Sequence, residues 1–133
     1  MASIMIVDDS SVTRKVIKKH IGSGPYANLN LIEASDGEQA LETFKGGAQP
    51  DVVLSDWNMP KMNGLEFVKK LREYETSIGT DPEKKVKIIM ITTEGTIDKV
   101  TEAMESGVNE YIVKPFTADT LNKTLKKVLP LRV

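Results

Sequence analysis

The sequence predicts an α/β protein in which a parallel sheet carries helices on both faces. Short apolar runs of strand length alternate along the chain with segments of helical periodicity. Five such strand and helix units follow one another, the pattern of a parallel sheet that is buried on both sides. A chain of 133 residues is long enough for one substantial core, so we expect a single domain spanning residues 1–133.

The composition is that of an ordinary globular protein and excludes several function classes. Hydrophobic residues make up 40% and charged residues 28% of the chain, which argues against disorder. With 18 basic and 19 acidic side chains, no global charge favours nucleic-acid binding. The absence of cysteine excludes disulfides and sulfur-ligated metals. Without a bilayer-length apolar stretch or a secretory signal pattern, we expect a cytoplasmic protein with no membrane insertion.

The first two units occupy the N-terminal third of the chain. A strand is expected over residues 4–7, followed by a helix that Ser10 or Ser11 caps. Four apolar residues are placed on one face of that helix: Val12, Val16, Ile17 and Ile21. A loop over residues 22–30 leads to a second strand at residues 31–34. The second helix opens at Asp36-Gly37, turns Ala40, Leu41 and Phe44 inward, and ends at Gly46-Gly47.

The third unit contains the most informative stretch of the chain. An apolar run beginning at Val52 ends in Asp56, and residues 57–60 stop the strand. An amphipathic helix with its charges in water is expected over residues 65–74, marked by Leu65, Val68, Leu71 and Arg72. Residues 75–85 are polar and contain Gly79 and Pro82, so we expect a long surface loop there.

The last two units repeat the pattern. A fourth strand at residues 88–91 is followed by a helix that starts at Thr96 or Ile97 and ends at Gly107. Its expected inward residues are Val100, Ala103 and Met104. A fifth strand covers residues 111–113, and the last helix begins at Thr117. That helix repeats Leu121, Leu125, Val128 and Leu129 at helical spacing.

Ionisable or hydroxyl side chains stand directly after four of the expected strands. They are Asp8 and Asp9, Asp56, Thr92, and Lys114. Because parallel strands end at one edge of the sheet, where α/β proteins bind ligands, we expect these side chains to share one crevice. Three carboxylates there repel one another and raise each other's pKa unless a cation compensates them. An all-oxygen site without His or Cys favours Mg²⁺, with Mn²⁺ or Ca²⁺ as alternatives.

Such a cluster suggests phosphoryl chemistry. Mg²⁺ is commonly held by one or two carboxylates together with phosphate oxygens. An aspartate can act as the nucleophile and form an aspartyl phosphate, with Thr92 and Lys114 as partners of the phosphoryl oxygens. Each residue alone has an ordinary explanation: Asp8-Asp9 as acids at a helix N-terminus, and Lys114 as a solvated charge. Their joint placement at strand ends favours the functional interpretation.

Five short motifs, in order, resemble the response-regulator receiver domains of two-component signalling, most closely their chemotaxis (CheY-like) branch. The motifs are Asp8-Asp9, Asp56-Trp57-Asn58-Met59-Pro60, Met62-Asn63-Gly64, Thr92-Thr93-Glu94 and Lys114-Pro115-Phe116. The resemblance covers essentially the whole chain. It implies a flavodoxin-like, doubly wound sheet of five parallel strands in the order 2-1-3-4-5 with five helices, an order for which CheY is a standard example.

The resemblance also implies a role for each site residue. Asp56 is the expected phosphoacceptor. The expected Mg²⁺ ligands are Asp8 through water, Asp9, Asp56 and the backbone carbonyl of Asn58. Lys114 and Thr92 are expected to bind the phosphoryl group while Tyr111 changes rotamer inward. Asn58 and Glu94 are expected to tune self-dephosphorylation, and the Lys114–Pro115 peptide is expected to be cis.

By the same resemblance, we expect a monomeric signalling domain that is no enzyme beyond assisting its own phosphorylation and dephosphorylation. Its phosphodonor is expected to be a histidine kinase of the CheA type. Its target is expected to be a flagellar motor switch protein or another partner, bound through the fourth helix, fifth strand and fifth helix.

Two alternatives and a few side-chain expectations remain open at this point. The alternatives are a phosphorelay intermediate and a magnesium-dependent phosphatase of the haloacid-dehalogenase type. The phosphatases usually carry Asp-x-Asp on the first strand, whereas here Asn58 fills the second position. Thr93 is bulkier than the alanine common beside the switch threonine in receivers. Trp57 is expected to be partly exposed, and His20 is expected to be a surface residue.

Overall fold

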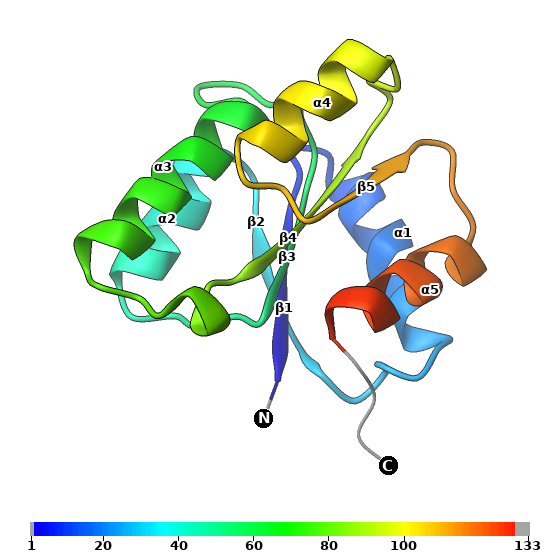
Figure 1. Cartoon of the computed structure of the whole chain (residues 1–133). Coiled ribbons are helices and arrows are strands. Elements are labelled where there is room, and N and C mark those ends of the chain that lie inside the picture. Colours follow the sequence, from blue (N-terminus) through cyan, green and yellow to red (C-terminus); the bar gives the residue numbers. More distant parts are fainter. Residues whose placement is uncertain (1, 130–133) are drawn as a thin grey trace.

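The computed structural model describes residues 2–129, and its centre is one parallel sheet (Figure 1). The strand order is β2-β1-β3-β4-β5, as the resemblance implies. The strands are β1 (Ser3–Val7), β2 (Asn30–Ala34), β3 (Val52–Ser55), β4 (Lys87–Thr92) and β5 (Glu110–Val113). The helices are α1 (Ser11–Gly22), α2 (Gly37–Lys45), α3 (Gly64–Ser77), α4 (Ile97–Glu105) and α5 (Ala118–Val128). A short 3₁₀ helix covers Pro82–Lys84.

Each face of the sheet has its own hydrophobic layer. Helices α1 and α5 cover one face, and α2, α3 and α4 cover the other (Figure 1). The alternation of side chains along β1 shows the division, because Ile4 and Ile6 pack with α1 and α5 whereas Met5 and Val7 pack with α2 and α3. Burial on both faces explains why the central strands are continuous apolar runs. No helix within residues 2–129 is long and apolar enough to span a bilayer.

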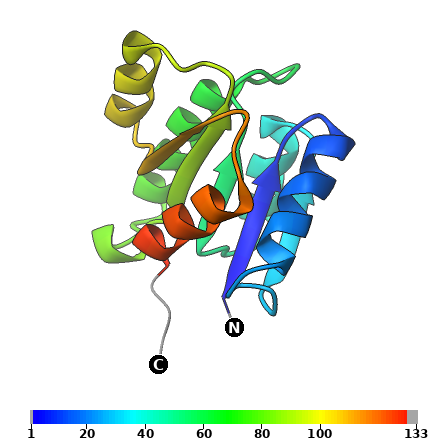
Figure 2. The same ribbon diagram turned by 90° about the vertical axis from the view of Figure 1, so that its right-hand side faces the viewer.

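The strand register places the polar residues that end β4 and follow β1, β3 and β5 at one edge of the sheet. Val7 pairs with Ser55, and Thr92 pairs with Val113. Hydrogen bonding continues one residue further, since the Asp56 N–H donates to the Val7 carbonyl at 3.0 Å and the Lys114 N–H to the Thr92 carbonyl at 2.8 Å. Figure 2 shows the start of β1 and the end of α5 at the opposite, lower edge.

Helix α3 is longer than the sequence analysis expects, which corrects the prediction of a loop over residues 75–85. The helix continues to Ser77. Glu75 is buried because its carboxylate accepts from the Val86 N–H at 2.8 Å and pairs with Arg72 at 2.7 Å. Arg72 does not face water either, since its guanidinium also donates to the Gly107 carbonyl. These polar contacts stabilise a final helical turn that hydrophobic periodicity does not reveal.

Three apolar residues predicted to face inward are exposed instead. Val12, Val16 and Met104 are 68%, 43% and 43% exposed. In α1 the inner stripe is Ile17 and Ile21, and Val16 lies one residue, about 100°, away from it. Ala103 is the one buried residue of α4, and Met104 is displaced from it by the same angle. These inward predictions for Val12, Val16 and Met104 are therefore wrong.

The β3–α3 connection depends on glycine at position 64. Asn63 caps α3 and forms a capping box with Glu66. The Gly64 N–H donates to the Trp57 carbonyl at 2.7 Å, which folds the connection back on the end of β3. A Cβ at Gly64 would lie 2.1 Å from the Asp56 carbonyl oxygen, so no larger residue fits without moving the backbone beside Asp56.

We predict that Gly64→Ala destabilises the protein by about 3 kcal/mol, because the added methyl group overpacks against backbone that cannot rotate away. The matched control is Gly22→Ala in α1, where a Cβ meets nothing within 4 Å. That variant should be neutral or up to about 1 kcal/mol more stable. Urea unfolding of the metal-free proteins measures both. Equal stability of the Gly64→Ala variant and the wild type would contradict the close approach of the Asp56 carbonyl oxygen to Gly64.

Candidate functional site

Three carboxylates meet at the carboxyl edge of the sheet, as the sequence analysis expects. Asp8 and Asp9 follow β1 and Asp56 follows β3, and one oxygen of each lies within 4.8 Å of the others. Asp8 is buried at 2% exposure, Asp56 is partly buried and Asp9 is exposed. The group thus has one side open to solvent. Carboxylate oxygens at this spacing suit a hard divalent cation such as Mg²⁺ or Mn²⁺.

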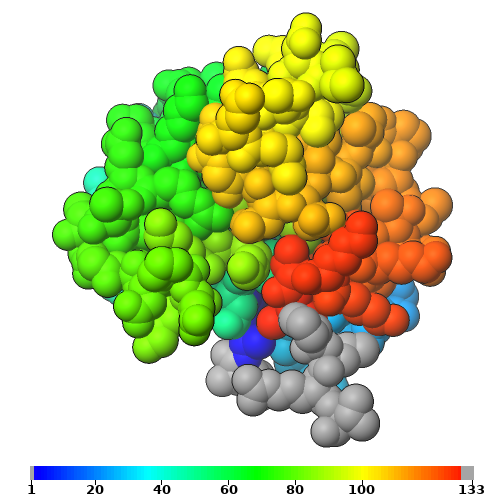
Figure 3. Space-filling view, viewed as in Figure 1, coloured from blue at the N-terminus to red at the C-terminus, as the bar shows by residue number. Residues whose placement is uncertain are grey.

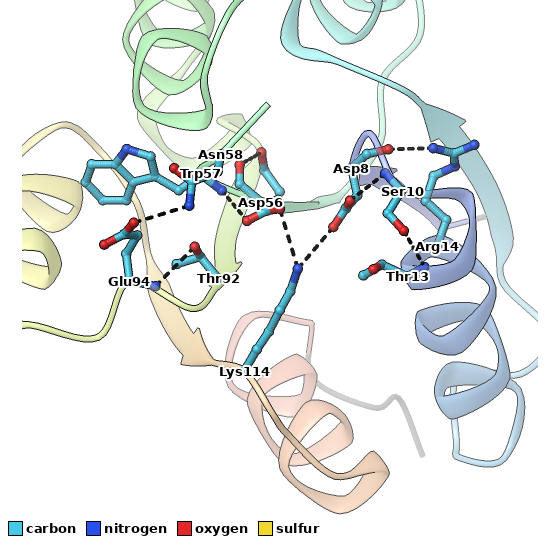
Figure 4. Close-up of polar contacts among 11 residues, drawn as sticks. Asp8, Ser10, Thr13, Arg14, Asp56, Trp57, Asn58, Thr92, Glu94 and Lys114 are labelled. Atoms are coloured by element: carbon cyan, nitrogen blue, oxygen red, sulfur yellow. Dashed lines mark hydrogen bonds and ion pairs between the residues drawn. The ribbon is translucent and has the colours of Figure 1, made fainter. Parts of the chain in front are cut away.

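Lys114 lies between two of these acids. Its Nζ atom is 3.3 Å from Asp8 Oδ2 and 3.5 Å from Asp56 Oδ2 (Figure 4). The pKa of Asp8 is nevertheless raised, chiefly because the carboxylate is buried and further by the charge of Asp56. The Ser10 N–H and Lys114 oppose this rise. The ionised Asp8 carboxylate is therefore buried at a cost that Lys114 and the Ser10 N–H do not fully offset. The Lys114–Pro115 peptide is cis, the conformation expected from the sequence.

The Asp56 side chain is fixed by its immediate neighbours. The Trp57 N–H donates to Asp56 Oδ1 at 2.7 Å, while Oδ2 faces Lys114. The indole of Trp57 is only 5% exposed, so the expectation of partial exposure is wrong. It packs in the core layer beneath α2 and α3 and is covered by Lys99 of α4, whose Nζ atom lies 4.9 Å from the ring centre.

The other predicted residues lie at the ends of β3, β4 and β5 and are linked to one another through Glu94. Thr92 is fully buried, and its hydroxyl accepts from the Glu94 N–H at 3.3 Å. The Tyr111 hydroxyl donates to the Glu94 carbonyl, which accounts for its half-buried position. Burial raises the pKa of Tyr111, and the charges of Glu94 and Asp56 raise it further. The Asn58 side chain donates to Glu94 Oε1 at 3.3 Å and thereby bridges the loops after β3 and β4.

Arg14, which is not among the residues predicted from the sequence, contacts the site through the backbone. Its Nη1 atom donates to the Asp8 carbonyl at 2.5 Å. A signal was available, because the first turn of α1 contains no acid and a cation near a helix N-terminus is unfavourable unless it has a partner. His20 is half-buried, with its ring edge-on to Phe116 at 5.7 Å, so it is not a plain surface residue.

Comparison with known proteins places this arrangement in a family. A model of the response regulator receiver domain matches residues 4–126. The chain is 43% identical over 126 residues to chemotaxis protein CheY1 of Helicobacter pylori, covering 95% of each chain. It is 41% identical over 129 residues to a CheY homolog of Campylobacter jejuni, covering 95% of this chain and 91% of the relative.

A solved structure agrees with these sequence relatives. The chemotaxis protein CheY4 of Vibrio cholerae superposes with a TM-score of 0.81 at 37% identity, covering 97% of this chain and 99% of that protein. Fold, acidic cluster and homology are consistent with a phosphorylation-activated signalling switch of the two-component type. The chain belongs to the response-regulator receiver domain family.

Proposed function

We propose that this protein is a chemotaxis switch in which Asp56 accepts a phosphoryl group from a histidine kinase of the CheA type. The observation that carries the proposal is the position of the Asp56 carboxylate, held through Oδ1 by the Trp57 N–H and flanked at Oδ2 by Lys114. A carboxylate oxygen of Asp56 forms the new bond to phosphorus as the bond from phosphorus to the donor's imidazole nitrogen breaks. That nitrogen leaves with its electron pair and is protonated by solvent.

The residues present fit a magnesium ion beside Asp56. Asp8, Asp9, Asp56 and the backbone carbonyl of Asn58 would hold it, and all four are hard oxygen donors. When bound, Mg²⁺ or Mn²⁺ neutralises charge on the phosphoryl oxygens during transfer. The charges support this assignment, because the three carboxylates of the cluster are approached by one ammonium group, that of Lys114.

Thr92, Lys114 and Tyr111 would convert the new charge into a change of shape. Lys114 would pair with the phosphoryl oxygens from the place where it now meets Asp56. The Thr92 hydroxyl would donate a hydrogen bond to the phosphoryl group. It would give up the hydrogen bond that it now accepts from the Glu94 N–H. Tyr111 binds the carbonyl of the same residue, so we propose that it follows Glu94 inward. Because the hydroxyls of Thr92 and Tyr111 both bind the backbone of Glu94, they would couple Asp56 to the β4–α4 loop.

Asn58 and Glu94 would set the lifetime of the phosphoryl group. Their side chains are hydrogen-bonded to each other and bridge the loops after β3 and β4. We propose that a water attacking the phosphorus enters past this pair. We therefore assign these two residues to the control of self-dephosphorylation.

The output surface would be the face formed by α4, β5 and α5. Figure 3 shows these elements, in yellow, orange and red, together on one side of the molecule. Ile97, Met104 and Val113 expose 81%, 43% and 45% of their surface there. We propose that a flagellar motor switch protein binds this face in the cytoplasm and that the free protein is a monomer.

The first prediction for this proposal concerns the acceptor. Acetyl phosphate with Mg²⁺ should add one labile phosphoryl group to the wild-type protein, seen by intact mass. Asp56→Asn should gain none, because the amide is no nucleophile at this position. Asp51→Asn is the matched control, since Asp51 lies at the other end of β3 and should leave phosphorylation unchanged. A phosphoryl group on the Asp56→Asn protein would refute the assignment, and steady turnover of small phosphate esters would favour a phosphatase instead.

The second prediction concerns the cost of the buried acid. Because the folded state raises the pKa of Asp8, the ionised carboxylate destabilises the metal-free fold at neutral pH, and this penalty disappears as the pH falls through the raised pKa towards 3.8. Asp8→Asn should therefore raise the Tm of metal-free protein by roughly 3–6 °C at pH 7, equivalent to about 1 kcal/mol, and by much less near pH 4.

Magnesium should make the wild type more stable than Asp8→Asn, which reverses the order of their Tm values. Millimolar Mg²⁺ should raise the Tm of the wild type, because an ion that binds only the folded state stabilises it, and should do little for Asp8→Asn. Thermal melts with EDTA or MgCl₂ at both pH values measure this. A metal-free wild type that is more stable than Asp8→Asn at pH 7 would contradict the electrostatic reasoning.

A further inference from the structure

We propose that Arg14 is a positioning residue for the metal site and that Glu33 anchors it. This inference rests on the proposed function, because it concerns the same acidic cluster. Arg14 lies in the second turn of α1, and its guanidinium reaches back over the β1–α1 loop to the Asp8 carbonyl at 2.5 Å (Figure 4). The Arg14 side chain is only 17% exposed, so it is held in place and not free in solvent.

Arg14 makes its second contact with Glu33 on the edge strand β2, and we call this link from Glu33 through Arg14 to Asp8 the brace. Arg14 Nε donates to Glu33 Oε1 at 3.0 Å, and Lys18 donates to Glu33 Oε2 at 3.0 Å. The hydrogen bond from Lys18 lowers the pKa of Glu33, with a further contribution from Arg14. Glu33 therefore stays ionised and fixes the guanidinium. The planar fork of arginine serves both partners at once, with Nε towards Glu33 and Nη1 towards Asp8.

The brace acts on the loop that presents two of the acids. Asp8 is held at both ends, because the Ser10 N–H donates to its Oδ1 atom at 2.9 Å while Arg14 holds its carbonyl. Oδ2 is thereby left facing Lys114 and the cluster. Asp9 follows directly in the chain, so a shift of the backbone at Asp8 would also move Asp9.

Positioning and simple electrostatics make opposite predictions for Arg14. A cation near the cluster should oppose the binding of Mg²⁺, so its removal should tighten binding if charge alone matters. Loss of a group that orients metal ligands instead weakens binding, typically by 10–100-fold. Lys18 supplies the matched control, because it carries the same charge and binds the same Glu33 but makes no contact with Asp8.

The test is Mg²⁺ titration of the full chain, followed by the fluorescence of Trp57 and by calorimetry. We expect Arg14→Met to weaken Mg²⁺ binding by roughly tenfold. Lys18→Met should change it by less than about twofold, and Glu33→Gln should give an intermediate loss. Arg14→Lys keeps the charge without the fork and should recover only part of the affinity. Equal or tighter binding by Arg14→Met would overturn the proposal, as would full recovery by Arg14→Lys.

Amide hydrogen exchange of the metal-free proteins tests the brace independently of the metal. The Ser10 amide, which donates to Asp8, should exchange faster in Arg14→Met and at the wild-type rate in Lys18→Met. Unchanged exchange at Ser10 in Arg14→Met would overturn the proposal. Wild-type protein that binds no Mg²⁺ would instead refute the proposed metal site, and the exchange result would still decide the role of Arg14.

Discussion

The confinement of three carboxylates, those of Asp8, Asp9 and Asp56, beside a single ammonium group is the constraint on which the rest of the site depends. Two unit charges 4.8 Å apart repel by about 1 kcal/mol in water and about 3–4 kcal/mol at the effective dielectric of a protein surface. Lys114 offsets part of this repulsion by approaching Asp8 and Asp56 within 3.5 Å. The two hydrophobic layers of the sheet supply the remaining stability. The site therefore has a deficit of positive charge that a divalent cation would relieve.

The topology makes this gathering of charge unavoidable. Strands β1 and β3 are neighbours in register, and the Asp56 N–H is bonded to the carbonyl of Val7, the residue before Asp8. Asp8 and Asp56 cannot separate without breaking the pairing of two strands that are buried on both faces. In a parallel sheet the strand ends are fixed by the whole ladder. Side chains that follow these strands are thus placed more precisely than those on a free loop.

The sequence predicted the strands, the helix order and the meeting of the three acids, because apolar runs and strand-end polar residues are local patterns. It failed where long-range partners decide. The last turn of α3 depends on Glu75 accepting from Val86 across the following connection, and periodicity contains no trace of that contact. Trp57 is buried because α4 returns to cover it with Lys99. Arg14 was missed because its partner at Asp8 is a backbone carbonyl, which no side-chain motif records.

A charge at Asp56 would move α4 in preference to α3. A complete shift between two states needs about 5.5 kcal/mol, which a few charge-assisted hydrogen bonds from Thr92 and Lys114 could supply. The helix with the fewest buried side chains is the easiest to displace. Helix α4 buries only Ala103, whereas α3 buries Phe67, Val68 and Leu71. The β4–α4 loop that precedes α4 is attached to Thr92 and Tyr111 through one residue, Glu94. Weak packing of the helix and attachment of its loop to Thr92 and Tyr111 would together make α4 more responsive than α3 to a phosphoryl group at Asp56.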